Sequence, residues 1–142
     1  MVKDIRVGAH SSYPSNLTAV GNTLYFIAYS GGFIERLWKS DGTEAGTVIV
    51  KDINPGEGSS HPSAFIAVDN TLYFTANDHE LWKSDGTEAG TNKYKEFPNA
   101  QLVAQVDGRV IYYVYGEDSF SLYSSDGTET GTVMLASTSI FW

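Results

Sequence analysis

An eleven-residue phrase occurs three times in this chain, and it constrains the fold more than any other feature. LWKSDGTEAGT occupies residues 37–47 and returns unchanged at 81–91, and a variant, LYSSDGTETGT, occupies 122–132. The Asp-Gly pairs begin at Asp41, Asp85 and Asp126, so the repeat interval is 44 and then 41 residues. Intervals of about 40 to 50 residues are typical of propeller blades and solenoid turns. The sequence therefore predicts three similar units.

Each unit is expected to contain four short β-strands, because no stretch shows a helical period of 3.6 residues. The expected first strands are 15–20, 63–68 and 101–106, and the expected second strands are 23–29, 71–77 and 109–115. The expected third strands are 36–40, 80–84 and 121–125, and the fourth are 47–53, 91–97 and 132–138. Gly-Asn, Asp-Asn and Asp-Gly separate the first two strands of each unit. These dipeptides favour hairpin turns because their residues tolerate positive φ.

The second strand of the first unit, TLYFIAY, is apolar or aromatic on both of its faces. Leu24 and Phe26 share one face, while Tyr25 and Ile27 share the other. A sheet with one solvent-facing side alternates apolar and polar residues, so this pattern favours a sheet covered on both sides. Four-stranded units repeated at this interval are typical of a β-propeller. We therefore predict one all-β domain, 1–142, with three four-stranded blades at approximately 6–53, 54–97 and 98–142.

The repeated phrase is interpreted as a structural hairpin between the third and fourth strands. An Asp carboxylate accepts hydrogen bonds from amides just ahead of it, and glycine supplies positive φ. The alternative is a cation site, since each loop carries an Asp and a Glu, but calcium takes about six to eight oxygen ligands. We favour the hairpin and predict no metal or other cofactor. The predicted structural residues are Asp41, Gly42, Thr43, Asp85, Gly86, Thr87, Asp126, Gly127 and Thr128.

Three blades are too few for a closed ring, since closed propellers have about four to eight. A three-blade arc leaves a sheet face open at each end, and exposed apolar faces usually mark interaction surfaces. Two copies of the chain would supply six blades. We therefore predict a homodimer that forms one six-bladed ring. The alternative is that the sequence is a fragment of a longer propeller.

The repeats also resemble a known family. LWKSDGTEAGT, followed by VKDINPGEGSSHPS and NTLYFTAND, is similar to the bacterial ELWxxDGT repeat, and HELWKSDGT at 79–87 matches its consensus. The first copy has Arg36 in place of Glu, and the third has Tyr123 in place of Trp. The resemblance implies a propeller-like fold and an extracellular or cell-surface location. It implies no catalytic residues, because the family has no catalytic residues that could be assigned to positions of this sequence.

Composition narrows the possible partners. The formal net charge is −8 and the nine Lys and Arg residues are scattered, so there is no basic stripe for nucleic acid. No apolar segment is long enough for membrane insertion. The chain has no cysteine, which removes disulfides and thiolate chemistry. The first residues, MVKDIRVG, lack the pattern of a secretion signal, so we expect any signal to be missing from this sequence.

Ligand contacts are expected on one rim, formed by loops that differ between the units. These loops are 6–13, 29–36, 54–62, 77–79, 95–101 and 115–119. The candidate ligand-binding residues are Tyr13, Tyr29, His61, His79 and Tyr115. Aromatic side chains of this kind stack on sugars or on partner proteins. The alternative is that the tyrosines complete strand packing.

The sequence favours a non-enzymatic module for assembly and for binding a protein or a glycan. His10, His61 and His79 show no metal-ligand spacing, and there is no G-x-S-x-G nucleophile motif. A carbohydrate-binding lectin that uses the rim aromatics is the second hypothesis. A glycoside hydrolase is the third, because its two carboxylates need only be close in space.

Overall fold

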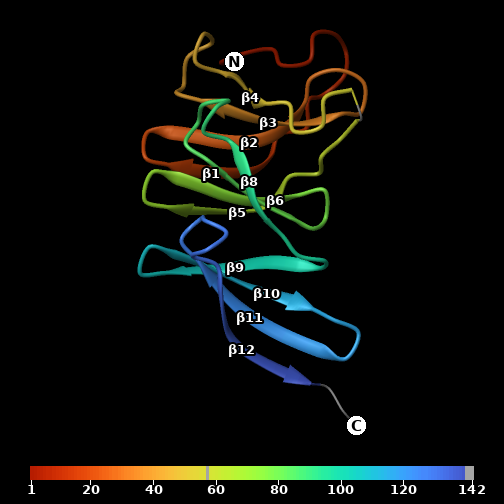
Figure 1. Cartoon of the computed structure of the whole chain (residues 1–142). Coiled ribbons are helices and arrows are strands. Elements are labelled where there is room, and N and C mark those ends of the chain that lie inside the picture. Colours follow the sequence, from red (N-terminus) through yellow and green to blue (C-terminus); the bar gives the residue numbers. More distant parts are fainter. Residues whose placement is uncertain (57, 140–142) are drawn as a thin grey trace.

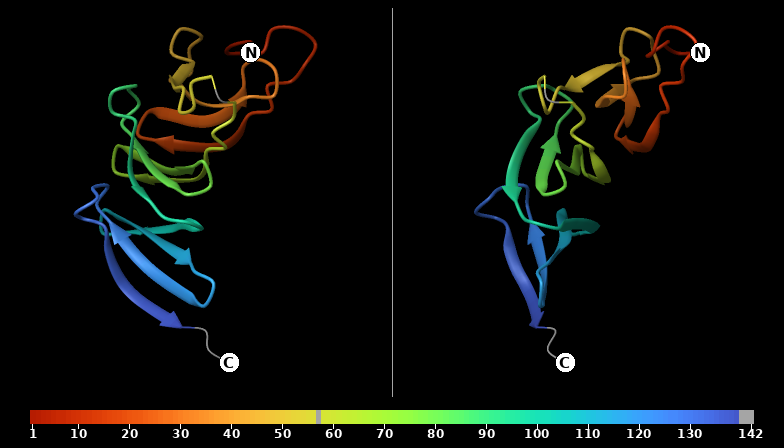
Figure 2. Two further views of the ribbon diagram at one scale, coloured as in Figure 1. Left: turned by 45° about the vertical axis from the view of Figure 1, so that its right-hand side comes forward. Right: turned by 90° about the vertical axis from the view of Figure 1, so that its right-hand side faces the viewer.

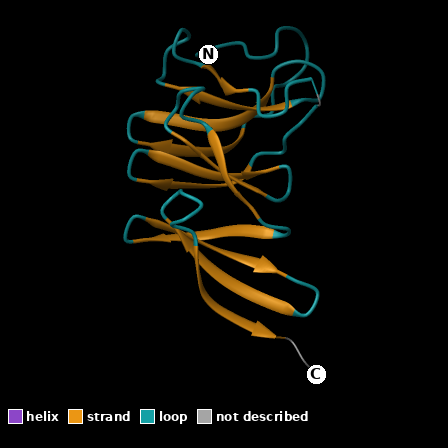
Figure 3. Ribbon diagram, in the orientation of Figure 1, coloured by secondary structure: helices purple, strands orange, loops and turns teal. Residues whose placement is uncertain are grey.

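The computed structural model describes residues 1–56 and 58–139 as strands, turns and loops, with no helix in that part of the chain (Figure 3). The prediction of an all-β protein is therefore confirmed. Residue 57, in the predicted rim loop 54–62, and residues 140–142, in the third predicted unit, lie outside the described residues.

Twelve strands form three separate antiparallel sheets of four strands, as predicted. Sheet 1 contains β1 (Ser15–Val20), β2 (Thr23–Tyr29), β3 (Glu35–Ser40) and β4 (Val48–Lys51). Sheet 2 contains β5 (Ser63–Val68), β6 (Thr71–Ala76), β7 (Glu80–Ser84) and β8 (Asn92–Glu96). Sheet 3 contains β9 (Ala100–Val106), β10 (Arg109–Tyr115), β11 (Ser119–Ser125) and β12 (Val133–Ser139). Within every sheet each strand pairs with the next strand along the chain.

The sheets stack in chain order, with sheet 2 between the other two (Figures 1 and 2). Their first strands lie against one another, β1 against β5 and β5 against β9, and in joint 2–3 β6 also contacts β9 and β10 contacts β5. We call the contact between two successive sheets a joint. The front face of a sheet points along the chain toward the next sheet, and the rear face is the opposite one.

Two of the three apolar clusters in the described part of the chain lie in the joints. In joint 1–2, Tyr25 and Leu37 on the front face of sheet 1 pack with Phe74 and Trp82 on the rear face of sheet 2. In joint 2–3, the cluster includes Tyr73 and Leu81 from sheet 2 and Val110 and Tyr112 from sheet 3. Strand β6 is therefore buried on both faces by the two joints, whereas the rear face of β2 is covered by Ile5, which packs on Phe26 and Trp38. Both strands consequently lack polar alternation.

The predicted fourth strands 47–53 and 91–97 are too long. β4 ends at Lys51 and β8 ends at Glu96, because the chain then crosses to the next sheet. Ile53 and Phe97 leave the sheet and pack in joints 1–2 and 2–3. β12 differs, since it stays paired with β11 as far as Ser139.

Candidate functional site

The loop after each third strand is held by the same set of hydrogen bonds in all three sheets. In the second loop, Asp85 Oδ1 accepts hydrogen bonds from the Thr87 amide at 2.9 Å and the Thr87 hydroxyl at 2.7 Å. The Thr87 hydroxyl in turn accepts from the Gly90 amide at 2.9 Å. The Thr91 hydroxyl donates to the Thr87 carbonyl at 2.6 Å and lies 2.7 Å from the Ser84 hydroxyl.

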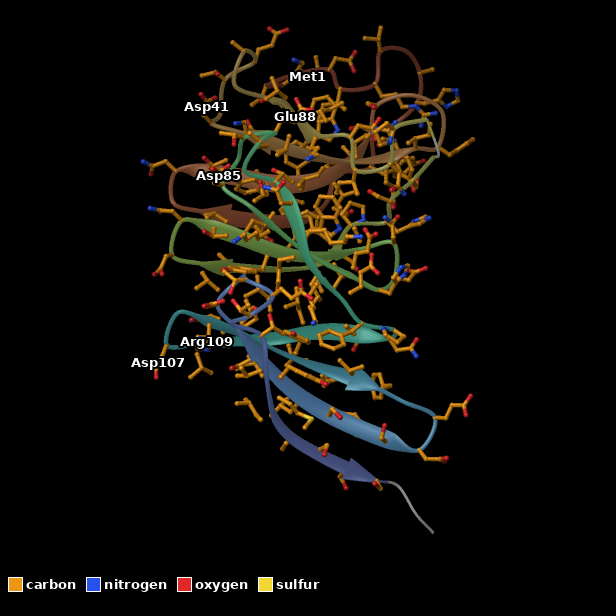
Figure 4. All side chains as sticks on the ribbon, viewed as in Figure 1. Met1, Asp41, Asp85, Glu88, Asp107 and Arg109 are labelled. Carbon is orange, nitrogen blue, oxygen red and sulfur yellow. The ribbon has the colours of Figure 1, made fainter. Side chains whose placement is uncertain are left out.

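The other two loops reproduce this network around Asp41 with Thr43 and around Asp126 with Thr128. Asp41 and Asp85 lie on the same side of the stack (Figure 4). In each loop, the Thr hydroxyl and amide hydrogen bonds lower the pKa of the Asp carboxyl. Each Asp carboxyl group is therefore ionised when it accepts the hydrogen bonds that hold its loop.

These loops also connect neighbouring sheets through a tyrosine–lysine pair on the front face of the preceding sheet. In joint 1–2, Lys39 Nζ donates to the Gly86 carbonyl at 2.5 Å. Tyr25 Oη lies 2.7 Å from where a Cβ on Gly86 would stand, and Gly86 has φ +92°. The loop can approach this closely only because residue 86 is glycine.

Joint 2–3 uses the aligned residues. Tyr73 Oη donates to the Asp126 carbonyl at 3.3 Å. The Lys83 side chain and the Tyr73 hydroxyl both lie against Gly127, whose φ is +86°. The pairs Tyr25–Lys39 and Tyr73–Lys83 occupy the same register in sheets 1 and 2.

Glu80 shows what the glutamate of the ELW phrase does. Its Oε2 accepts a hydrogen bond from Trp82 Nε1 at 2.9 Å and another from Asn77 Nδ2 at 2.8 Å. Burial alone would raise the pKa of Glu80, but these two bonds and the Lys93 charge lower it. In sheet 1, Arg36 takes this place and pairs with Asp52 at 3.3 Å. Trp38 Nε1 is consequently buried with no acceptor among the described residues.

Three of the predicted ligand-binding residues meet at the rim of joint 1–2, around Glu35. Tyr29 Oη donates to Glu35 Oε1 at 3.0 Å, and His61 Nδ1 lies 3.2 Å from Glu35 Oε2. The Tyr13 ring packs edge-on against Tyr29, with centroids 6.2 Å apart. Tyr13 and His61 both have positive φ, 45° and 47°. We call Tyr13, Tyr29, Glu35 and His61 the rim cluster.

His79 and Tyr115 lie elsewhere. A ligand atom of His79 lies within 4.8 Å of carboxylate oxygens of Glu80 and Glu96, which is a possible cation cluster. Lys93 Nζ already bonds both carboxylates, so its ammonium supplies the positive charge there. Tyr115 belongs to an aromatic group with Tyr113 and Phe120, with ring centroids 4.7 to 5.0 Å apart.

The sequence interpretation missed Glu35 and the tyrosine–lysine pairs. Two aligned tyrosines, at 25 and 73, and two aligned lysines, at 39 and 83, were visible signals for the pairs. Glu35 carried no such signal, because its position in the rim cluster depends on how sheets 1 and 2 stack.

No family model matches the chain, and a search of curated proteins finds no match to it. Among the described residues, no helix has the length and apolar character needed to cross a membrane.

Proposed function

We propose that the chain is a non-enzymatic β-propeller module of the ELWxxDGT type, which works by assembly and by binding. The observation that carries this proposal is the repeated joint, in which the DGT loop of one sheet contacts the front face of the sheet before it. Because the two joints stack their sheets in the same way, further blades can be added in the same arrangement. The resemblance further supports an extracellular or cell-surface location.

The two end faces supply the binding surface for assembly. Each four-stranded face covers roughly 300 Å², from strands of about five residues spaced about 4.8 Å apart. Two copies that close a six-bladed ring form two new joints and bury four faces, which is roughly 1,200 Å² in total. That area is at the lower end for stable protein interfaces, so the dimer should depend on concentration.

The test is the molar mass of the purified chain, measured by light scattering over a range of micromolar concentrations. The measured molar mass should rise from the 15.5 kDa of one chain toward twice that value as the concentration rises. A particle that keeps the mass of one chain throughout this range, and melts cooperatively, would contradict the proposal.

A carbohydrate-binding lectin is the second candidate, and the rim cluster favours it. Tyr13 is 65% exposed and packs on Tyr29, whose hydroxyl bonds the Glu35 carboxylate that also contacts His61. An exposed aromatic ring stacks on a sugar, and the neighbouring polar groups would bind its hydroxyls. A glycan array probed with the wild type and with Tyr13→Ala tests this candidate. Signals that are the same for both proteins would count against the rim cluster.

A further inference from the structure

Residues that are buried in the internal joints recur, uncovered, on the front face of sheet 3. Val20 and Val68 are 6% and 5% exposed in joints 1–2 and 2–3, while the aligned Val106 is 54% exposed. Likewise Val50 is 5% exposed and the aligned Leu135 is 53% exposed. The front face of sheet 3 thus retains the apolar composition of a joint and lacks the sheet that would cover it.

The rear face of sheet 1 is the complementary surface. Leu17 is 61% exposed, whereas the aligned Phe65 of sheet 2 packs against the core of joint 1–2. Surface hollows on this face are lined by Val2 and Leu24. Gly42 has φ +94° and nothing within 4 Å of its Cβ position, although the aligned Gly86 and Gly127 each contact a tyrosine. This face therefore has the form of a joint whose preceding sheet is missing.

The chain segments that cross each joint also fit together. Lys51 Nζ donates to the Thr91 carbonyl at 2.9 Å, and Lys3 Nζ makes the equivalent bond to the Thr47 carbonyl at 2.9 Å. Ile5 packs on Phe26 and Trp38 as Ile53 packs on the corresponding cluster of sheet 2. Sheet 1 thus already carries a crossing segment on its rear face.

Sheet 3 has no crossing segment over its front face in the described residues, because Thr138, which aligns with Ile53, stays paired with Phe120. Among the described residues, β12 therefore leaves the front face of sheet 3 open to the crossing segment of a second sheet 1.

Side chains at the rim match in the same way. In joint 1–2, His61 of sheet 2 contacts Glu35 of sheet 1, so a polar residue meets a polar residue. At a contact between copies, Tyr13 would take the place of His61, with which it aligns in the sequence. Phe120 would take the place of Glu35, since Phe120 pairs with Tyr115 as Glu35 pairs with Tyr29. There an aromatic residue would meet an aromatic residue.

The contact between copies differs from the internal joints in one respect. The places of the tyrosine and the lysine are taken in sheet 3 by Ile111 and Ser124, which pair with each other in the same register. Arg109 bonds Ser124 and the Gly131 carbonyl, within its own sheet. Sheet 3 has no side chain placed to bond the Gly42 loop of another copy as Lys39 bonds Gly86.

We propose that the front face of sheet 3 binds the rear face of sheet 1 of a second copy, through apolar contacts that lack the tyrosine–lysine pair. We call this contact the closing joint. The inference rests on the proposed function. It adds that the two copies separate at the two closing joints of the ring. The internal joints, which have the polar pairs, stay intact when the copies separate.

Two variants test the closing joint from opposite directions, with the dissociation constant of the dimer as the readout. Val106→Glu places a charge in the closing joint and should weaken the dimer at least about a hundredfold, because a buried unpaired charge is costly. Phe33→Glu, at a residue that is 84% exposed and whose carbonyl faces Ser59 in the internal joint 1–2, is the matched control and should leave the constant unchanged. Circular dichroism and a cooperative melt check that each variant folds.

The second variant, Ile111→Tyr with Ser124→Lys, introduces the missing pair and should tighten the dimer roughly tenfold or more. Adding Gly42→Ala should remove much of this gain, because the new Cβ would meet the introduced tyrosine. The same change alone should hardly alter the wild-type dimer, where Ile111 is too short to reach.

The outcomes separate the two proposals. If the wild type is a single chain at every concentration, the proposed function fails and the closing joint fails with it. If the wild type dimerises but neither variant changes the constant, the proposed function stands and the closing joint is wrong. Assemblies larger than two copies, or a dimer that Val106→Glu leaves intact, would also overturn the closing joint.

Discussion

At the scale of single residues, the three loops form a comparison within one chain. Gly42, Gly86 and Gly127 have similar φ values, +94°, +92° and +86°, but only the last two lie against a tyrosine. Substitutions at these aligned glycines can therefore separate the cost of backbone strain from the cost of losing the contact with tyrosine. The Ser, Thr and Asp residues around them make the same bonds in each loop.

Gly86→Ala should therefore destabilise the protein more than Gly42→Ala does. Both substitutions strain the backbone by about 1–3 kcal/mol, because alanine rarely adopts this φ. Gly86→Ala in addition displaces Tyr25 and disturbs the Lys39 bond, at a further cost of about 1–3 kcal/mol. Urea unfolding at one fixed protein concentration measures the difference. Equal losses for the two variants would show that the contact of Tyr25 with Gly86 does not contribute.

At the scale of elements, the hairpin loops link stability to pH. The pKa of Asp85 lies below its usual 3.8 because Thr87 bonds the carboxylate in the folded state. A carboxyl group with a lowered folded pKa stabilises the fold above its unfolded pKa, and this stabilisation is lost as the pH falls through the folded pKa. Asp41 and Asp126 shift in the same direction.

The melting temperature should accordingly fall as the pH is lowered below about 4. Asp85→Asn keeps an oxygen acceptor but cannot ionise, so its melting temperature should depend less steeply on pH in this range. Thermal melts of both proteins between pH 6 and pH 2.5 make the comparison. Parallel curves would argue that Asp85 holds its loop without its charge.

Most of the strand order could be predicted, because each strand carries a local signal. The turn dipeptides, the aromatic second strand and the Trp or Tyr of the third strand recur in aligned positions. The predicted strands 47–53 and 91–97 extend past the true ends of β4 and β8. An apolar residue such as Ile53 or Phe97 can continue a strand or pack in a joint, and the sequence does not distinguish the two. The rim cluster was predicted only in part, since Glu35 and His61 lie 26 residues apart and meet through the stacking of two sheets.

At the scale of the whole molecule, three similar sheets stack and leave one face uncovered at each end of the stack. Sheet 2 is covered on both faces, while sheets 1 and 3 each keep one face that has the residues of a joint. The chain carries a net charge of −8, so two copies repel each other over a distance. Added salt screens that repulsion and should favour association.

A cross-link between two copies can be placed at chosen positions of the closing joint, because the chain has no cysteine of its own. Lys51 Nζ lies 3.5 Å from the Glu88 carbonyl in joint 1–2, and Lys95 Nζ lies 3.4 Å from Glu129 Oε1 in joint 2–3. The aligned residues at the closing joint are Ala136 of one copy and Glu44 of the other. Ala136 pairs with Leu122 in the register in which Lys51 pairs with Leu37.

The measurement mixes a copy carrying Ala136→Cys with a copy carrying Glu44→Cys and adds a short bis-maleimide. Lys51→Cys with Glu88→Cys in one chain is the positive control for linking across a joint. If the closing joint forms, the mixture should give a covalent product of two chains, and either variant alone should give far less. A mixture that stays unlinked while the control links, at concentrations where the wild type is a dimer, would contradict the closing joint.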